Sequence, residues 1–171
     1  MNSQIVINVL RFLVLLFLQV LVLDNIQLGG YINPYLYVLF VLLLPFETPG
    51  YLMLLSSFLL GLGVDMFSGS GGIHAASLTL IAFLRPYLLG VLSSAREYEP
   101  GIRPGIADLG FRWFVTYAGL LIFVHHLALF LLEMFSFKGL GATLQRTFAS
   151  ALVTFLMVMV VQYLFYPLRS S

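Results

Sequence analysis

Long apolar runs alternate with short polar stretches over nearly the whole chain, and six such runs can be distinguished. Most of them approach the roughly 20 residues that a helix needs to cross a bilayer. The pattern predicts an all-α integral membrane protein, a six-transmembrane-helix bundle that forms a single domain over residues 1–171. The expected spans cover residues 5–23, 34–46, 51–67, 73–92, 111–132 and 148–168.

The second run, residues 34–46, is the shortest and lies between prolines. As a helix it would be roughly 20 Å long at 1.5 Å per residue, against a hydrocarbon core of roughly 30 Å. It either extends back to Tyr31 or crosses the bilayer only in part. A re-entrant segment here would leave five spans and would move residues 93–110 to the other side of the membrane.

The composition agrees with a membrane location. Hydrophobic residues make up 61% of the chain and charged residues 9%, whereas soluble globular domains are about 25% charged. The net charge of +1, with no basic stripe, gives no reason to expect nucleic-acid binding. The absence of cysteine excludes disulfides, thiolate nucleophiles and cysteine-ligated clusters. No small-residue cleavage pattern follows the first run, so we expect it to remain as a span.

Positive charge is distributed unevenly between the two expected ends of the bundle. Cytoplasmic loops of membrane proteins carry an excess of lysine and arginine. With six spans, one side would hold Lys138 and Arg146 and the other side the remaining six cations, so we expect both termini in the cytoplasm. Those six are Arg11, Arg85, Arg96, Arg103, Arg112 and Arg169.

Five of the runs carry small or polar residues at steps of three and four, which places them on one face of a helix. Small residues let membrane helices approach closely, and polar residues hydrogen-bond across the interface. A packed bundle with these stripes turned inward explains them, and a polar cavity or a groove for a partner is the alternative. The stripes are Asn8, Arg11 and Gln19; Ser57, Gly61 and Asp65; Ala75, Thr79, Ala82 and Pro86; Arg112, Thr116, Gly119, His126 and Glu133; and Ser150, Thr154 and Gln162.

The stretch that joins the third and fourth runs contains residues that are costly in lipid. Asp65 falls at the outer end of the third span, where a carboxylate costs less than at the bilayer centre. We expect it to cap the following turn by accepting backbone N–H bonds. Arg85 precedes a helix-kinking proline, and we expect its side chain to snorkel toward the cytoplasmic headgroups. Glu47 is a more plausible partner for Arg85 than Asp65, because Arg85 lies roughly 16 Å along the axis from His74.

Catalytic chemistry finds little support in the sequence. His125, His126 and Glu133 are the most tempting metal ligands, but adjacent histidines point to different faces of a helix. No HExxH or GxSxG motif occurs. We therefore expect a protein that is not an enzyme and that needs no metal or cofactor.

Three short motifs follow one another in the first half of the chain. Asn33-Pro34-Tyr35-Leu36 opens an apolar span, a later span ends on Gly61-Leu-Gly63-Val-Asp65, and Gly72-Ile-His74-Ala75 opens the next after a serine/glycine turn. This order resembles the rod shape-determining protein family MreD, in which a proline opens the second span and a GLxxD…G…A stretch joins two spans. The resemblance covers the whole chain in length and hydropathy, and the specific motif covers about residues 34–86. The candidate partner-binding or hairpin residues are Pro34, Gly61, Gly63, Asp65, Gly72 and His74.

The resemblance implies a non-catalytic scaffold of the bacterial cell-elongation machinery, located in the inner membrane. Such a protein binds the membrane protein MreC, joins MreB filaments and peptidoglycan synthases through it, and supports cell shape. The family's fold is similar to the six-helix substrate-binding subunit of energy-coupling vitamin transporters. A subunit of that kind is the alternative function, with Asp65, His74 and His126 around an outward-facing pocket.

Overall fold

Five long helices dominate the computed structural model, which describes residues 2–26, 31–92, 101–134 and 139–165. All five are long and apolar enough to cross a membrane, which supports a multi-pass membrane protein. No strand occurs in these ranges, so the all-α prediction is confirmed there. The long helices are α1 (Asn2–Leu21), α3 (Gly50–Ser68), α4 (Ile73–Leu92), α6 (Phe111–Met134) and α7 (Leu140–Phe165), and the short ones are η1 (Leu23–Asn25), η2 (Leu36–Val38), α2 (Leu39–Leu42) and α5 (Ile106–Leu109).

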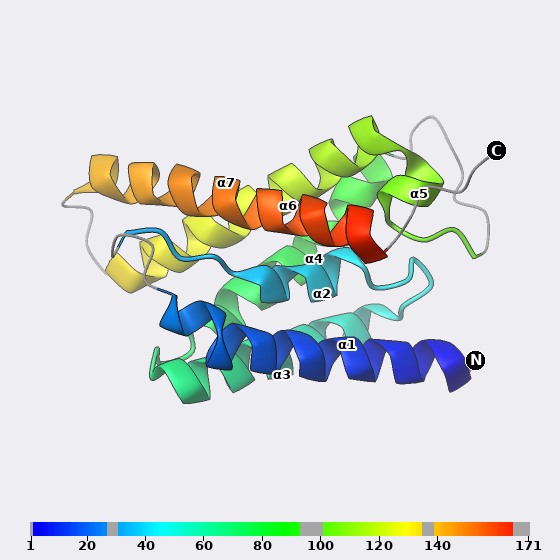
Figure 1. Ribbon diagram of the computed structural model, residues 1–171, viewed down its shortest axis with the longest axis horizontal. Coiled ribbons are helices and arrows are strands. Elements are labelled where there is room, and N and C mark those ends of the chain that lie inside the picture. Colours follow the sequence, from blue (N-terminus) through cyan, green and yellow to red (C-terminus); the bar gives the residue numbers. More distant parts are fainter. Residues whose placement is uncertain (1, 27–30, 93–100, 135–138, 166–171) are drawn as a thin grey trace.

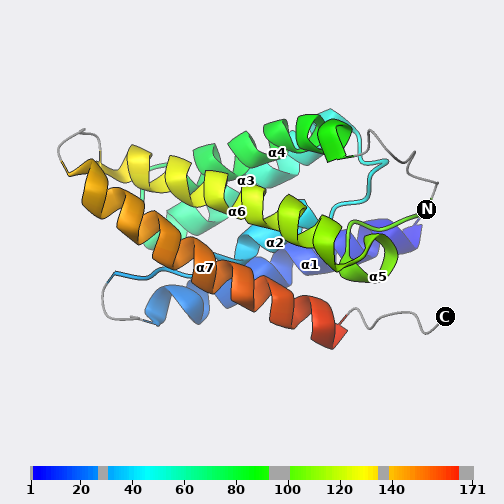
Figure 2. The same cartoon turned by 90° about the horizontal axis from the view of Figure 1, so that it is seen from above.

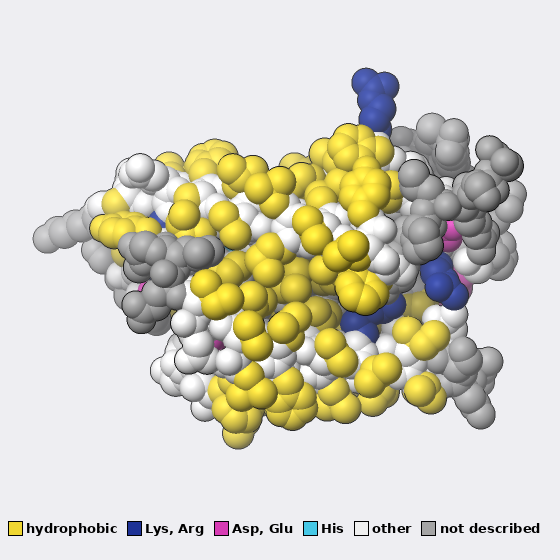
Figure 3. Space-filling view, in the orientation of Figure 1, with side chains coloured by type: hydrophobic (Ala, Val, Ile, Leu, Met, Phe, Trp, Pro, Cys, Tyr) yellow, Lys and Arg dark blue, Asp and Glu magenta, His cyan; other side chains and the backbone are white. Residues whose placement is uncertain are grey.

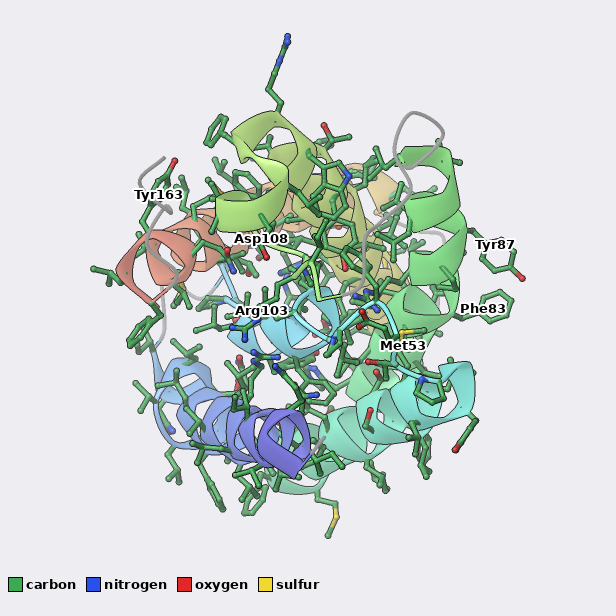
Figure 4. All side chains as sticks on the ribbon, turned by 90° about the vertical axis from the view of Figure 1, so that its right-hand side faces the viewer. Met53, Phe83, Tyr87, Arg103, Asp108 and Tyr163 are labelled. Carbon is green, nitrogen blue, oxygen red and sulfur yellow. The ribbon has the colours of Figure 1, made fainter. Side chains whose placement is uncertain are left out.

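The long helices lie lengthwise beside one another, and the start of α1 and the end of α7 are at the same end of the bundle (Figures 1 and 2). Residues 31–46 run through the middle of this arrangement, from the end where α1 finishes toward the end where α3 begins. Viewed along the bundle, α2 lies near the centre with the long helices around it (Figure 4). The second apolar run therefore occupies the interior.

The second run is not the helix over residues 34–46 that we expected. The backbone is irregular up to Tyr35, forms one 3-10 turn, and then makes the single helical turn of α2. Two prolines explain why helical backbone is confined to the middle of this run. The residue before Pro34 is restricted to extended conformations, and Pro45 cannot continue a helix. Extended backbone rises about 3.3 Å per residue against 1.5 Å in a helix, so the short run reaches farther in this form.

Residues 31–46, which we call the broken segment, include the most enclosed part of the protein. Every residue from Pro34 to Leu44 is buried, and Tyr37, Val38, Val41 and Leu42 have no exposed surface. An apolar run without an amphipathic pattern is consistent with burial on all sides. The segment is thus an interior element with protein around it.

The last helix begins earlier than the apolar pattern predicted. α7 starts at Leu140 rather than at residue 148, because its first two turns contain polar residues that an apolar run does not include.

At the end of the bundle opposite the start of α7, large tyrosine rings lie on the surface: Tyr51, Tyr87 and Tyr163 are each more than half exposed. Figure 4 shows Tyr87 and Tyr163 pointing outward from their helices. Tyrosines at this level are typical of a membrane–water interface.

Candidate functional site

The turn between α3 and α4 is built around the carboxylate of Asp65. Gly69 has a φ of 66° and ends α3, and its N–H donates to the Asp65 carbonyl at 2.8 Å. The Asp65 carboxylate accepts from the backbone N–H of His74 at 3.0 Å and of Ala75 at 2.8 Å, and from Ser70 Oγ at 2.5 Å. These are donors that the first turn of a helix leaves without intrahelical partners. Asp65 therefore caps the start of α4 from within the preceding helix, as the sequence predicted.

Three glycines of the motif have three different roles. A Cβ on Gly61 would lie 2.5 Å from the Cα of Ala75, so α3 and α4 cross there with backbone against backbone. A Cβ on Gly63 would lie 3.0 Å from Leu16 Cδ1, where α3 meets α1. Gly72 has open space around it but a φ of 98°, which side-chain-bearing residues rarely adopt. The α3–α4 hairpin thus depends on Gly61 for its close packing and on Gly72 for its turn.

The imidazole of His74 lies in a buried chain of polar side chains. The Tyr37 hydroxyl bonds to His74 Nδ1 at 2.7 Å and to His125 Nε2 at 2.9 Å. The Tyr35 ring packs edge-on to His74, with ring centroids 5.1 Å apart. Through these two hydrogen bonds, Tyr37 of the broken segment links α4 to α6. The apolar pattern around Tyr37 in the sequence did not indicate this role.

The two adjacent histidines of α6 are both fully buried, with ring centroids 5.3 Å apart. We expected His125 and His126 to point to different faces, and His125 does bind a different element, through Tyr37, from the one that His126 binds. They reach different partners, because His126 Nε2 lies 3.1 Å from Thr154 Oγ1 on α7. Both rings also pack against Tyr35 of the broken segment, with ring centroids 6.0 and 5.3 Å away. Within the described ranges, no group of three histidines or acids is placed to hold a metal ion.

Backbone groups at the start of the broken segment bind side chains from α1 and α7. In lipid, irregular backbone is tolerated only where protein or water provides such partners. The pairs are Asn33 N to Ser150 Oγ at 3.1 Å, Tyr35 N to Thr154 Oγ1 at 3.0 Å, and Gln19 Nε2 to the Pro34 carbonyl at 3.0 Å.

Three carbonyls at the end of the segment are bound in the same way. Leu42 is the last residue of α2, and Leu43 and Leu44 follow it, where a helix leaves its last carbonyls without intrahelical donors. The donors come from three different helices: Tyr117 Oη on α6 to the Leu42 carbonyl at 3.0 Å, Arg11 Nη1 on α1 to the Leu43 carbonyl at 3.0 Å, and Arg85 Nη2 on α4 to the Leu44 carbonyl.

The expectation for Arg85 is therefore wrong. Its side chain is 2% exposed, so it turns into the bundle rather than toward the headgroups. Arg85 Nε also donates to Tyr117 Oη at 2.7 Å. Glu47 instead accepts from the backbone N–H of Gly101 at 3.2 Å, and the single ion pair among the described residues joins Arg146 to Glu133. A guanidinium supplies several donors in a fixed plane, which suits a site with neighbouring carbonyls.

The polar stripes are partly confirmed. Those of the first, third and last spans do turn inward, with Gln19, Ser57, Asp65, Ser150, Thr154 and Gln162 all buried. The stripe predicted for α6 holds at His126, which is buried, and at Gly119, which is half-buried and faces Phe155 of α7. It is wrong at Arg112, Thr116 and Glu133, which are exposed, and the buried face instead carries Phe114, Tyr117, Leu121 and His125. Pro86 on α4 is exposed as well.

A cavity of about 420 Å³ lies at the end of the bundle where α1 finishes and the α3–α4 hairpin turns. Its charged residues are held by neighbours: Asp24 accepts from Gln19 Nε2 at 2.7 Å, and Arg146 pairs with Glu133 at 3.0 Å. Of the candidate residues, Pro34 and His74 line the cavity, whereas Asp65 and His126 do not. The lining is Val20, Leu23, Asp24, Asn25, Asn33, Pro34, Tyr35, Phe67, Ser68, Ser70, Ile73, His74, Glu133 and Arg146.

Substitution of Gly61 by alanine tests the close crossing of the hairpin. Gly61→Ala would force α3 and α4 apart, and we expect it to lower the stability by about 1–3 kcal/mol, as overpacking does. Gly90→Ala is the matched control, since a Cβ there meets nothing within 4 Å, and it should be neutral or stabilising by about 0.5–1 kcal/mol. Thermal unfolding in detergent, followed by circular dichroism, measures both. Equal melting temperatures for the two variants would contradict the crossing.

Comparison with known proteins adds no relative. No protein-family model matches the chain, and neither a curated protein nor a solved structure is significantly similar to it. A functional proposal therefore rests on the structure described above and on the sequence motif between Pro34 and His74.

Proposed function

We propose that this protein is a non-catalytic membrane scaffold that works by binding another membrane protein through its helix surfaces. The observation that carries the proposal is that polar side chains at membrane depth are engaged in hydrogen bonds to the protein's own backbone. Arg11, Arg85 and Thr154 each bind backbone groups of the broken segment. Polar chemistry in the interior thus has a structural use, and the outer surface is what the protein presents to others.

The resemblance to MreD supplies the setting for this proposal. In it, the protein sits in a bacterial inner membrane and binds an MreC-type protein, and MreB filaments and peptidoglycan synthases join through that partner. The hairpin supports the resemblance, because Gly61, Asp65, Gly72 and His74 form one compact unit around the Asp65 cap. A motif that specifies a hairpin in detail is consistent with a fixed surface for a partner.

The proposal includes six crossings with both termini in the cytoplasm. The broken segment counts as the second crossing, because it runs from one end of the bundle toward the other (Figure 1). The end where α1 begins, which faces the viewer in Figure 4, includes Arg103 and the start of α6 with Arg112. At the other end, Asp24 and Glu133 accompany Arg146. This distribution follows the positive-inside rule.

A second candidate function is favoured by the cavity. Its volume of about 420 Å³ falls within the range of small-molecule sites. Irregular backbone at Asn33 and Pro34 forms part of its wall, as unwound segments do in many transporters. A substrate-binding subunit of an energy-coupling vitamin transporter would use such a cavity.

Purification of the tagged protein from its native membrane in mild detergent separates the two functions. We expect an MreC-type protein, together with wall synthases, to be recovered with it and identified by mass spectrometry. Recovery of an ATPase pair with a large coupling subunit would instead support the transporter function. Recovery of neither set would contradict the scaffold.

A topology reporter tests the six crossings. A reporter inserted after Gly101 should give a cytoplasmic signal, and a second reporter in the Ser68–Gly72 turn should give an external one. An external signal at Gly101 would contradict the six crossings with both termini in the cytoplasm.

A further inference from the structure

The cavity of about 420 Å³ at the hairpin end of the bundle is lined by residues of every long helix and of the broken segment. Its inner part is buried, because Tyr35 is 7% and His74 4% exposed, whereas Asp24 and Glu133 are exposed and lie at its mouth. In Figure 3, acidic side chains reach the surface at this end, which is at the left of the view. The cavity therefore has an acidic entrance and a polar interior.

One negative charge of the lining has no cationic partner among the described residues. Arg146 pairs with Glu133 at 3.0 Å, so these two charges compensate each other. The carboxylate of Asp24 accepts instead from neutral groups, Gln19 Nε2 at 2.7 Å and Ser68 Oγ at 2.9 Å. Two carboxylates against one guanidinium leave the described lining with a net charge of −1. Such a cleft raises the local concentration of cations.

The inner wall also offers an imidazole nitrogen without a partner in the described part of the chain. His74 lines the cavity, and its Nδ1 is bound to the Tyr37 hydroxyl at 2.7 Å, whereas its Nε2 has no hydrogen bond there. Polar atoms of buried side chains normally have a partner. Because Tyr37 also bonds to His125 Nε2 at 2.9 Å, a group bound at His74 Nε2 would join the chain of hydrogen bonds that crosses to α6.

The other walls are apolar, which limits the class of cation. Val20 and Leu23 lie on one side, and Phe67 and Ile73 on another. A metal ion would need several ligands close together, and no group of three histidines or acids is placed for one in the described ranges. Apolar walls with a carboxylate at the mouth suit a molecule with a charged head and an apolar body.

We propose that this cavity binds a small organic cation, a protonated amine with a compact apolar body. The amine is attracted by Asp24, a polar group of the ligand binds His74 Nε2, and the body packs against Phe67 and Ile73. The inference goes beyond the scaffold function. It rests on the second candidate function, the substrate-binding subunit, and gives its cavity a class of ligand.

Thiol modification at single introduced cysteines measures the preference of the cavity for cations. The chain has no native cysteine, so Ser68→Cys places the only thiol in the lining. Gly141→Cys is the control at the same end of the bundle, because it lies outside the cavity and a Cβ there meets nothing within 4 Å. The reagents are 2-aminoethyl methanethiosulfonate, which is cationic, and 2-sulfonatoethyl methanethiosulfonate, which is anionic. Both form a mixed disulfide and release methanesulfinate.

We expect the ratio of the cationic to the anionic rate to be roughly fivefold or more higher at Ser68→Cys than at Gly141→Cys, because the cavity concentrates cations. Adding Asp24→Asn to Ser68→Cys should bring the ratio to within about twofold of the control. Unchanged melting temperatures show that the variants are folded. Equal ratios at the two thiols would mean that the cavity is already neutralised, and a high ratio that survives Asp24→Asn would mean that another group attracts the cation. Either result overturns the inference.

Protection of the Ser68→Cys thiol tests binding itself, with neutral methyl methanethiosulfonate as the reagent. Benzylamine, benzyl alcohol and benzoate share a ring and differ in charge. We expect benzylamine to protect the thiol at a concentration roughly tenfold lower than benzyl alcohol, and benzoate not to protect it. Asp24→Asn should remove the advantage of benzylamine. Equal protection by benzylamine and benzyl alcohol, or none by benzylamine, would contradict the amine site.

The outcomes separate the ligand from both candidate functions. Protection by benzylamine without recovery of an ATPase pair in the purification would leave the amine site standing and the transporter subunit wrong. Recovery of the ATPase pair without protection would leave the transporter subunit standing and the amine site wrong. The scaffold function is independent of both results, since it is tested by recovery of the partner protein.

Discussion

Hydrogen bonds from surrounding side chains to the backbone of the broken segment are the constraint on which the structure depends. A segment of short helix and irregular backbone cannot face lipid, because its N–H and C=O groups would lack partners. Here Ser150, Thr154 and Gln19 bind it at its start, and Arg11, Arg85 and Tyr117 bind it at its end. These partners come from four long helices, so the segment ties the helices together as they enclose it.

This constraint also explains the costly residues of an otherwise apolar chain. Two buried or half-buried arginines at membrane depth would be expensive as isolated charges. Each donates to a backbone carbonyl of the broken segment, Arg11 to Leu43 and Arg85 to Leu44, and a guanidinium supplies several donors for such a site. The interior polar groups thus give the bundle a specific architecture, and the outer helix faces and the cavity remain for contact with other molecules.

The sequence predicted what local patterns determine and missed what depends on distant contacts. The long helices follow from apolar runs of membrane length, and the Asp65 cap follows from a carboxylate beside a glycine turn. The interior path of residues 34–46 was not predicted: their shortness and their prolines indicated a helix extended back to Tyr31 or a partial crossing, not an irregular segment through the interior. The partner of Arg85 and the buried face of α6 depend on where that segment lies, so reasoning from each helix alone gave the wrong answer for both.

Amide hydrogen exchange of residues 31–44 in lipid nanodiscs tests the account most directly. The account predicts slow exchange at the Tyr35 amide, which donates to Thr154 Oγ1 at 3.0 Å. Thr154→Val should accelerate exchange at that amide, whereas Thr79→Val should not, because the Thr79 hydroxyl binds within its own helix. Fast exchange at Tyr35 in the wild type, or no change with Thr154→Val, would contradict the claim that these side chains hold the broken segment in place.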